Sequence, residues 1–100
     1  MRIRYTRPAL ADLEAILEHI ATRSPRGAKR VQAKIRSAIG LMPRHPLIGT
    51  KTDDPRTRRL VITPYPYLVF YEPTADEIII HAIRHAARKL GATSSSRAPG

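Results

Sequence analysis

Apolar residues recur through the first half of the chain with the period of amphipathic helices. In the first segment they are separated by three or four residues and share one helix face: Leu10, Leu13, Leu17 and Ile20. Thr6 or Arg7 would precede the first helix, with Pro8 in its first turn. Ser24-Pro25 gives the second helix the same start signal, a capping hydroxyl followed by proline at the first helical position. A second apolar stripe follows, and Pro43 ends it: Ala28, Val31, Ile35, Ala38 and Met42. We therefore predict helices over residues 8–22 and 25–42, paired as an antiparallel hairpin.

The period changes to that of β-strands in the rest of the chain. Alternation in residues 2–5 predicts a short strand before the first helix. Runs rich in β-branched or aromatic residues predict three more strands, over residues 59–62, 67–71 and 77–84. Three prolines and a glycine interrupt residues 43–57, where we predict a loop. Residues 91–100 have little to bury, so we predict a disordered tail after a single domain over residues 1–90.

The predicted order is β-α-α-β-β-β, a helical hairpin packed on one small, mainly antiparallel sheet of the α+β class. The last two strands are apolar at both their odd and their even positions, so both of their faces should be covered. We therefore expect them to be the central strands. Short turns between the strands place two aromatic and two basic residues at one sheet edge: Tyr65, Tyr67, Arg84 and His85. Two arginines fall toward the opposite edge, beside Tyr71: Arg58 and Arg59. A β-bulge would shift this register by one residue.

Charge narrows the class of partner. The chain of 100 residues carries 18 Lys+Arg against 8 Asp+Glu, a formal net charge of +10, and the second predicted helix contributes much of this basic field. Such a balance favours a polyanionic partner, namely nucleic acid, the ribosome, anionic lipid or an acidic protein. The chain has no cysteine, which excludes disulfides, thiolate catalysis and cysteine-based metal sites. It also has neither a membrane-length apolar run nor a signal-peptide pattern, so we expect a cytoplasmic protein without a membrane partner.

Basic residues concentrate directly after the last predicted strand: Arg84, His85, Arg88 and Lys89. Arginines there could hold phosphates while His85 serves as general acid or base, as in a metal-free nuclease. The same cluster could instead be an electrostatic docking surface, with His85 packing at a strand end. Tyr65 and Tyr67 suit base stacking, and a turn whose rings cover the core explains them equally well.

Metal and phosphate-loop chemistry have little support. His19 and His45 have no carboxylate at a ligand spacing, and the five glycines are scattered. His81 lies within an apolar strand and is interpreted as a hydrogen-bonded sheet histidine. The acidic pairs at 53–54 and 76–77 fall in predicted turns. We therefore expect no metal and no cofactor.

Five segments, in this order and in a chain of this size and charge, carry a family resemblance: residues 8–14, 42–49, 58–61, 67–72 and 83–88. Together they resemble toxins of the RelE/ParE superfamily from bacterial type II toxin–antitoxin systems, over roughly residues 1–90. The resemblance implies a toxin neutralised by a cognate antitoxin, typically an acidic and partly disordered protein lying over the grooves and sheet of the toxin. It also implies a toxin–antitoxin hetero-oligomer.

The resemblance leaves two targets open. RelE-like members cleave mRNA at the ribosome, whereas ParE-like members inhibit DNA gyrase and lack a nuclease site. RelE-like nucleases usually place an arginine directly after the tyrosine that begins the strand at 67–71, and this chain has Leu68 there. Lys51 is the only lysine in the 43–57 loop, which is also unlike the nucleases.

We therefore favour a ParE-like gyrase inhibitor, in which no residue breaks bonds. The residues expected to meet the target or the antitoxin are Arg58, Arg59, Tyr65, Tyr67, Arg84, His85, Arg88 and Lys89. The alternative is a RelE-like ribosome-dependent mRNA endoribonuclease, whose catalytic candidates are Arg84, His85 and Arg88. A non-catalytic basic nucleic-acid-binding domain is the further alternative.

Overall fold

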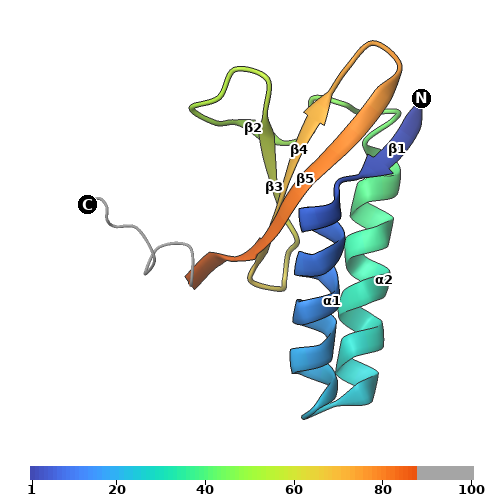
Figure 1. The fold of residues 1–100 in the computed structure, drawn as a ribbon, viewed down its shortest axis with the longest axis vertical. Coiled ribbons are helices and arrows are strands. Elements are labelled where there is room, and N and C mark those ends of the chain that lie inside the picture. The colour runs from blue at the N-terminus through green and yellow to red at the C-terminus, as the bar shows by residue number, and fades with distance from the viewer. Residues whose placement is uncertain (88–100) are drawn as a thin grey trace.

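The computed structural model describes residues 1–87, which form a two-helix hairpin against a five-stranded sheet (Figure 1). The elements are β1 (Arg2–Tyr5), α1 (Arg7–Ala21), α2 (Pro25–Leu41), β2 (Thr50–Lys51), β3 (Arg58–Val61), β4 (Tyr67–Pro73) and β5 (Glu77–His85). The predicted α+β class and helical hairpin are confirmed. The predicted tail, Arg88 and Lys89 lie outside the described residues.

Both helices begin at the start signals found in the sequence. The Thr6 hydroxyl accepts a hydrogen bond from the Ala9 N–H at 3.2 Å, and the Ser24 hydroxyl accepts one from the Gly27 N–H at 2.9 Å. Each cap satisfies a backbone donor that the helix leaves unpaired, and a cap of this kind stabilises a helix by about 1 kcal/mol. The observed helix bounds lie within one residue of those predicted.

The strand order is β1-β5-β4-β3-β2, with β1 parallel to β5 and the other neighbours antiparallel. The sheet is thus mainly antiparallel, and β4 and β5 are central, as predicted. One expectation was wrong in part: residues 43–57 are not loop throughout, because Thr50 and Lys51 form β2 against β3. A strand of two residues is too short to show a period in the sequence.

The predicted grouping of residues at the two ends of the strands also holds, although a β-bulge shifts the register of β4 against β5. Tyr67 pairs with His85 and Arg58 pairs with Tyr71, so the two expected sheet edges form. A bulge interrupts the ladder: Phe70 opposes Ala82 while Tyr71 opposes Ile80, which leaves His81 as the extra residue.

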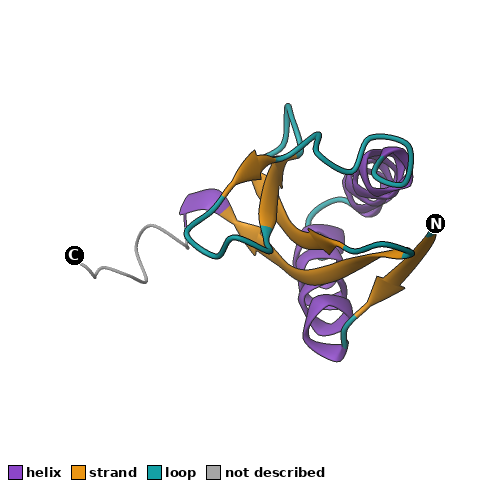
Figure 2. Cartoon of the chain, turned by 90° about the horizontal axis from the view of Figure 1, so that it is seen from above, coloured by secondary structure: helices purple, strands orange, loops and turns teal. Residues whose placement is uncertain are grey.

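The core lies between the sheet and the apolar stripes of the helices, which Figure 2 shows nearly end-on beside the curved sheet. Its largest fully buried side chains come from α2, the central strands and the segments that flank them: Tyr71, Ile35, Ile39, Met42, Ile62, Ile78, Ile80, Ile83 and Val69. Within residues 1–87, no helix combines the length and apolar character needed to cross a membrane.

Candidate functional site

The first candidate surface lies at the end of the sheet where β4 begins and β5 ends. It is formed by Tyr65, Tyr67, Arg84 and His85, and we call it the Arg84 edge. The side chain of Arg84 is 59% exposed, and its Nε lies 3.7 Å from the Asp12 carboxylate on α1. The same carboxylate accepts the Ile83 N–H at 3.0 Å, where β5 extends past its pairing with β1. Asp12 therefore both caps the free edge of β5 and partly neutralises Arg84.

The aromatic residues of the Arg84 edge belong mainly to the core. Tyr67 is buried, and its ring meets the His85 ring edge-on with centroids 5.3 Å apart. Tyr65 is partly buried against the same core. The His85 Nδ1 accepts the Ala87 N–H at 3.1 Å, so it holds the turn that follows β5. Arg84 is the exposed cation of this edge within the described residues, and the buried rings leave little area for base stacking.

The opposite edge is organised around a set of hydrogen bonds that we call the loop anchor, made by Pro46, Gly49, Arg58 and Tyr71. The buried Tyr71 hydroxyl donates to the Pro46 carbonyl at 2.9 Å and accepts the Gly49 N–H at 2.8 Å. Arg58 Nη1 donates to the Gly49 carbonyl at 2.7 Å. The anchor thus ties the long loop after α2 to β3 and β4.

Close packing at Gly49 and the burial of Tyr71 characterise the loop anchor. A Cβ at Gly49 would lie 2.8 Å from the Arg59 carbonyl oxygen and 2.9 Å from the Tyr71 ring, so the chain approaches too closely for a side chain. Burial raises the pKa of Tyr71 above its ordinary 10.0, and the Gly49 N–H and the Arg58 charge offset part of that rise. The sequence signal for this anchor was only a glycine in a loop, and its partners are distant along the chain.

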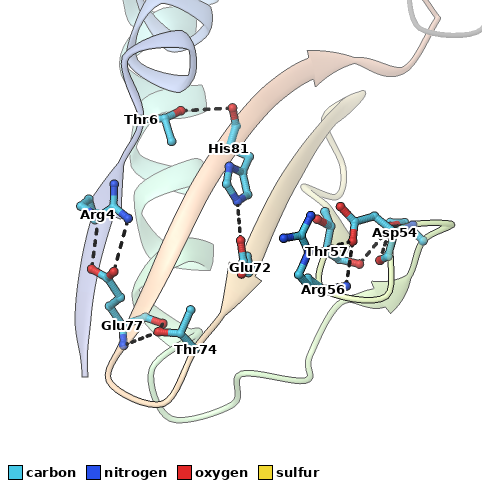
Figure 3. Close-up of polar contacts among 10 residues, drawn as sticks. Arg4, Thr6, Asp54, Arg56, Thr57, Glu72, Thr74, Glu77 and His81 are labelled. Atoms are coloured by element: carbon cyan, nitrogen blue, oxygen red, sulfur yellow. Dashed lines mark hydrogen bonds and ion pairs between the residues drawn. The ribbon is translucent and has the colours of Figure 1, made fainter.

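A histidine–carboxylate pair spans β4 and β5. His81 Nε2 lies 2.9 Å from Glu72 Oε1 (Figure 3), which agrees with the interpretation of His81 as a hydrogen-bonded sheet histidine. On the neighbouring strand Arg59 opposes Phe70, and the Arg59 Nε is buried without a hydrogen-bond partner in residues 1–87.

Asp53, Asp54 and Asp76 lie in turns, as expected, whereas Glu77 lies in a strand. Asp54 accepts the Arg56 N–H at 2.9 Å, and this bond lowers the pKa of Asp54 below its usual 3.8 (Figure 3). Glu77 begins β5 and binds the Arg4 guanidinium at 3.2 and 3.3 Å. The described part of the chain contains no cluster of three or more His, Asp or Glu suited to a metal ion.

α2 is strongly basic, and one of its cations, Lys29, lines a hollow together with Glu14 and Glu18 of α1. The helix has five basic residues and no acidic one: Arg26, Lys29, Arg30, Lys34 and Arg36. None of them forms an ion pair with a carboxylate of residues 1–87. Arg26, Arg30 and Lys34 stand four residues apart and define what we call the α2 ridge. Each like-charged pair at this spacing destabilises a helix by about 0.2–0.5 kcal/mol, and cations near its N-terminus oppose the helix dipole.

Comparison with known proteins identifies the family. A family model described as the ParE toxin of the type II toxin–antitoxin system parDE matches residues 3–90. The chain belongs to this toxin family. It is 34% identical over 87 residues to Toxin RelE2 of Caulobacter vibrioides, covering 87% of this chain and 97% of that protein. It is also 34% identical over 85 residues to Putative toxin Y4kP of Sinorhizobium fredii, covering 85% of this chain and 88% of that one.

Solved structures agree with the family. The toxin superimposes on a chain of the chromosomal ParDE system from P. aeruginosa with a TM-score of 0.74 at 25% identity, covering 85% of this chain and 95% of the other. YafQ from E. coli strain BL21(DE3) shares the fold, with a TM-score of 0.61 at 14% identity and coverage of 91% and 100%. The RelE/ParE superfamily inferred from the sequence is confirmed, and membership of a toxin–antitoxin system implies an antitoxin partner.

Proposed function

We propose that this toxin is a ParE-like inhibitor of DNA gyrase that a cognate antitoxin neutralises in a hetero-oligomeric complex. The observation that carries the proposal is Leu68. It occupies the position where RelE-like nucleases usually hold an arginine, and it is an apolar residue only 8% exposed. Removing one charged partner of a transition-state phosphate costs a nuclease a few kcal/mol. The ParE family match and the ParDE structural relative support the same choice.

In this proposal the toxin acts by binding, and no side chain breaks a bond. The Arg84 edge is the surface we assign to gyrase, because Arg84 projects into solvent with one distant carboxylate as its ion-pair partner. Arg88 and Lys89 continue the same basic stretch in the sequence. Arg58 is the less suitable contact, since its guanidinium already binds loop carbonyls. Gyrase is a cytoplasmic target, so the proposal also places the toxin in the cytoplasm.

One observation favours the RelE-like alternative. The His81–Glu72 pair joins an imidazole to a carboxylate, an arrangement that can orient a general base. In a ribosome-dependent endoribonuclease such a base would take the proton of a ribose hydroxyl, with arginines stabilising the phosphate. The two functions therefore predict different targets for the same fold.

The deciding experiment follows labelled amino-acid incorporation in bacteria during the first minutes after the toxin is induced without antitoxin. Under the proposal, incorporation continues while division stops, and purified toxin inhibits gyrase supercoiling. The variant Arg84→Ala/His85→Ala, checked for folding by circular dichroism, should need about tenfold more protein for the same inhibition, as expected when two interface contacts are lost. Abrupt arrest of incorporation would support the endoribonuclease, and unaffected growth would contradict both functions.

A further inference from the structure

On the side of β5 that faces away from β4, β1 covers only the first part of the strand. β1 pairs with residues 77–80, and β5 continues beyond them without a neighbouring strand on that side in residues 1–87. Side chains from the start of α1 bind the uncovered main chain instead. The Thr6 hydroxyl donates to the His81 carbonyl at 3.2 Å (Figure 3), and the Asp12 carboxylate accepts the Ile83 N–H at 3.0 Å.

Asp12 makes its two contacts through the same carboxylate oxygen, Oδ2. The hydrogen bond from the Ile83 N–H, at 3.0 Å, has the ordinary length of an N–H···O bond. The Arg84 Nε lies 3.7 Å away, which is beyond that length, and the Arg84 side chain is 59% exposed. The carboxylate is therefore bound firmly to the main chain and only loosely to the guanidinium. Arg84 can turn to a partner while Asp12 keeps the strand in place.

The hydrogen bond at Ile83 also determines where the next side chain points. Successive side chains of a strand point to opposite faces, so a fixed main chain at Ile83 gives Arg84 a fixed direction. A strand end that is bound on one side only opens more easily, and its side chains then point in several directions. Asp12 supplies the bond that a neighbouring strand would otherwise provide. Target binding then costs less conformational entropy, because Arg84 is already directed.

We propose that Asp12 is the positioning residue of the Arg84 edge: through the Ile83 N–H it holds the end of β5 so that Arg84 points to the target. The inference rests on the proposed function, because the Arg84 edge is the surface assigned to gyrase. Asp12 itself does not touch the target and acts through the main chain of β5. An anionic group of the target replaces the loose contact between Asp12 and Arg84, and the main-chain bond remains.

The test compares two substitutions that remove the same charge. In Asp12→Asn the amide oxygen still accepts the Ile83 N–H, whereas Asp12→Ala has no acceptor. Amide hydrogen exchange at Ile83, followed by NMR in the purified toxin, measures the main-chain bond. A gyrase supercoiling assay measures the toxin concentration that gives half-inhibition. Glu14→Gln is the matched control on the same helix, because Glu14 lines the hollow between α1 and α2 and not the Arg84 edge.

We expect Asp12→Ala to speed exchange at Ile83 at least about tenfold and to need about fivefold more toxin for half-inhibition. Asp12→Asn should keep exchange within about threefold of wild type. It should also inhibit at least as well as wild type, because Arg84 has lost a competing carboxylate. Glu14→Gln should match wild type in both measurements. Charge alone cannot produce this order, since Asp12→Ala and Asp12→Asn remove the same negative charge.

A general loss of stability is separated from positioning by a variant of the core. Ile35→Val destabilises the fully buried core without touching the Arg84 edge. It should inhibit gyrase like wild type under conditions where circular dichroism shows that the variants are folded. Asp12→Ala should need about fivefold more toxin under the same conditions.

A second comparison tests whether Asp12 acts through Arg84. In the Arg84→Ala background, adding Asp12→Ala should raise the half-inhibiting concentration by less than about twofold, because the positioned side chain is absent. The control background is Arg30→Ala, which removes a cation of the α2 ridge that forms no ion pair in residues 1–87. There Asp12→Ala should still raise that concentration about fivefold.

Equal inhibition by Asp12→Asn and Asp12→Ala would overturn the inference, and so would a full loss from Asp12→Ala in the Arg84→Ala background. Unchanged exchange at Ile83 in Asp12→Ala would overturn it whatever the target. Failure of wild-type toxin to inhibit gyrase would contradict the proposed function instead. The exchange measurement, and the same ranking of variants in a growth-inhibition assay, would then still test Asp12, so the two failures are distinguishable.

Discussion

Arg58 on β3 and Arg84 on β5 flank the central strand β4 and lie toward its opposite ends, where Arg58 pairs with Tyr71 and Arg84 with Leu68. Both follow or begin apolar runs, and from the sequence both were expected to meet a partner. In the structure Arg58 donates to the Gly49 and Leu47 carbonyls, so its charge holds a loop in place. Arg84 extends into solvent 3.7 Å from Asp12. The two arginines differ in what their N–H groups already bind.

This difference indicates which arginine is available for recognition. A hydrogen bond from a charged group to a fixed backbone acceptor contributes about 1.5–3 kcal/mol to stability, whereas an exposed ion pair contributes about 0–1 kcal/mol. Arg58 would have to release the loop carbonyls in order to bind a partner, and the toxin would lose folding stability. Moving Arg84 would cost almost nothing. Stability should therefore depend on the loop anchor, and target binding on the Arg84 edge.

The largest effect is expected at Gly49. The variant Gly49→Ala should lose about 2–3 kcal/mol of unfolding free energy, because its Cβ would press on the Arg59 backbone and the buried Tyr71 ring. Gly40→Ala is the matched control, since nothing lies within 4 Å of a Cβ there and alanine favours the helix by up to about 1 kcal/mol. Urea denaturation measures both. Equal stability of the two variants would contradict the close approach of the chain at Gly49.

The next effect is expected at Tyr71. Tyr71→Phe removes two hydrogen bonds and leaves the Gly49 N–H unpaired, which should cost about 2 kcal/mol. The raised pKa of Tyr71 also predicts a pH dependence. The unfolded chain ionises first as pH rises, so the tyrosine's contribution is complete below about pH 10 and is lost as pH passes the higher folded pKa.

Denaturation at pH 8 and at pH 10.5 separates these two consequences. Wild-type toxin should lose more stability over this interval than Tyr71→Phe. Tyr5, whose pKa burial also raises, leaves a smaller loss in the variant. An identical pH response in both proteins would show that Tyr71 is as free to ionise in the folded state as in the unfolded one.

The smallest effects on stability, and the sharpest contrast, come from the two arginines. Arg58→Ala should lose about 1–2 kcal/mol, because the Gly49 carbonyl loses its charged donor. Arg84→Ala should change stability by less than about 0.5 kcal/mol. Gyrase inhibition, measured under conditions where both variants are folded, should fall only for Arg84→Ala. The reverse pattern would contradict the assignment of the two edges.

Local signals in the sequence predicted most of the fold. The proline and hydroxyl caps at Thr6 and Ser24 marked the helix starts, and apolar residues at both parities marked the central strands. The short turns were enough to bring Tyr67 beside His85. Each of these features depends on neighbours close in the chain.

The remaining features depend on contacts between distant segments. β2 is a pair of residues defined only by its partner strand, and the hydrogen bonds of Tyr71 reach back 22 and 25 residues. The role of Arg58 likewise depends on distant residues, because it donates to the Leu47 and Gly49 carbonyls of the loop after α2. Arg88 and Lys89, which are outside the described residues, stay a prediction.

The bulge at His81 divides β5 into two segments in which the alternation of inward and outward side chains is offset by one residue. Before it Ile78 and Ile80 face the core, and after it Ile83 does. Uninterrupted alternation from Ile80 would direct Arg84 inward and Ile83 outward. Deleting a single residue at the bulge would restore uninterrupted alternation. The residues after the bulge would then change sides, with Arg84 turned to the core and Ile83 to solvent. The toxin should therefore tolerate substitutions in this strand far better than changes in its length. The number of residues in the strand, with the bulge residue included, determines that Arg84 points to solvent.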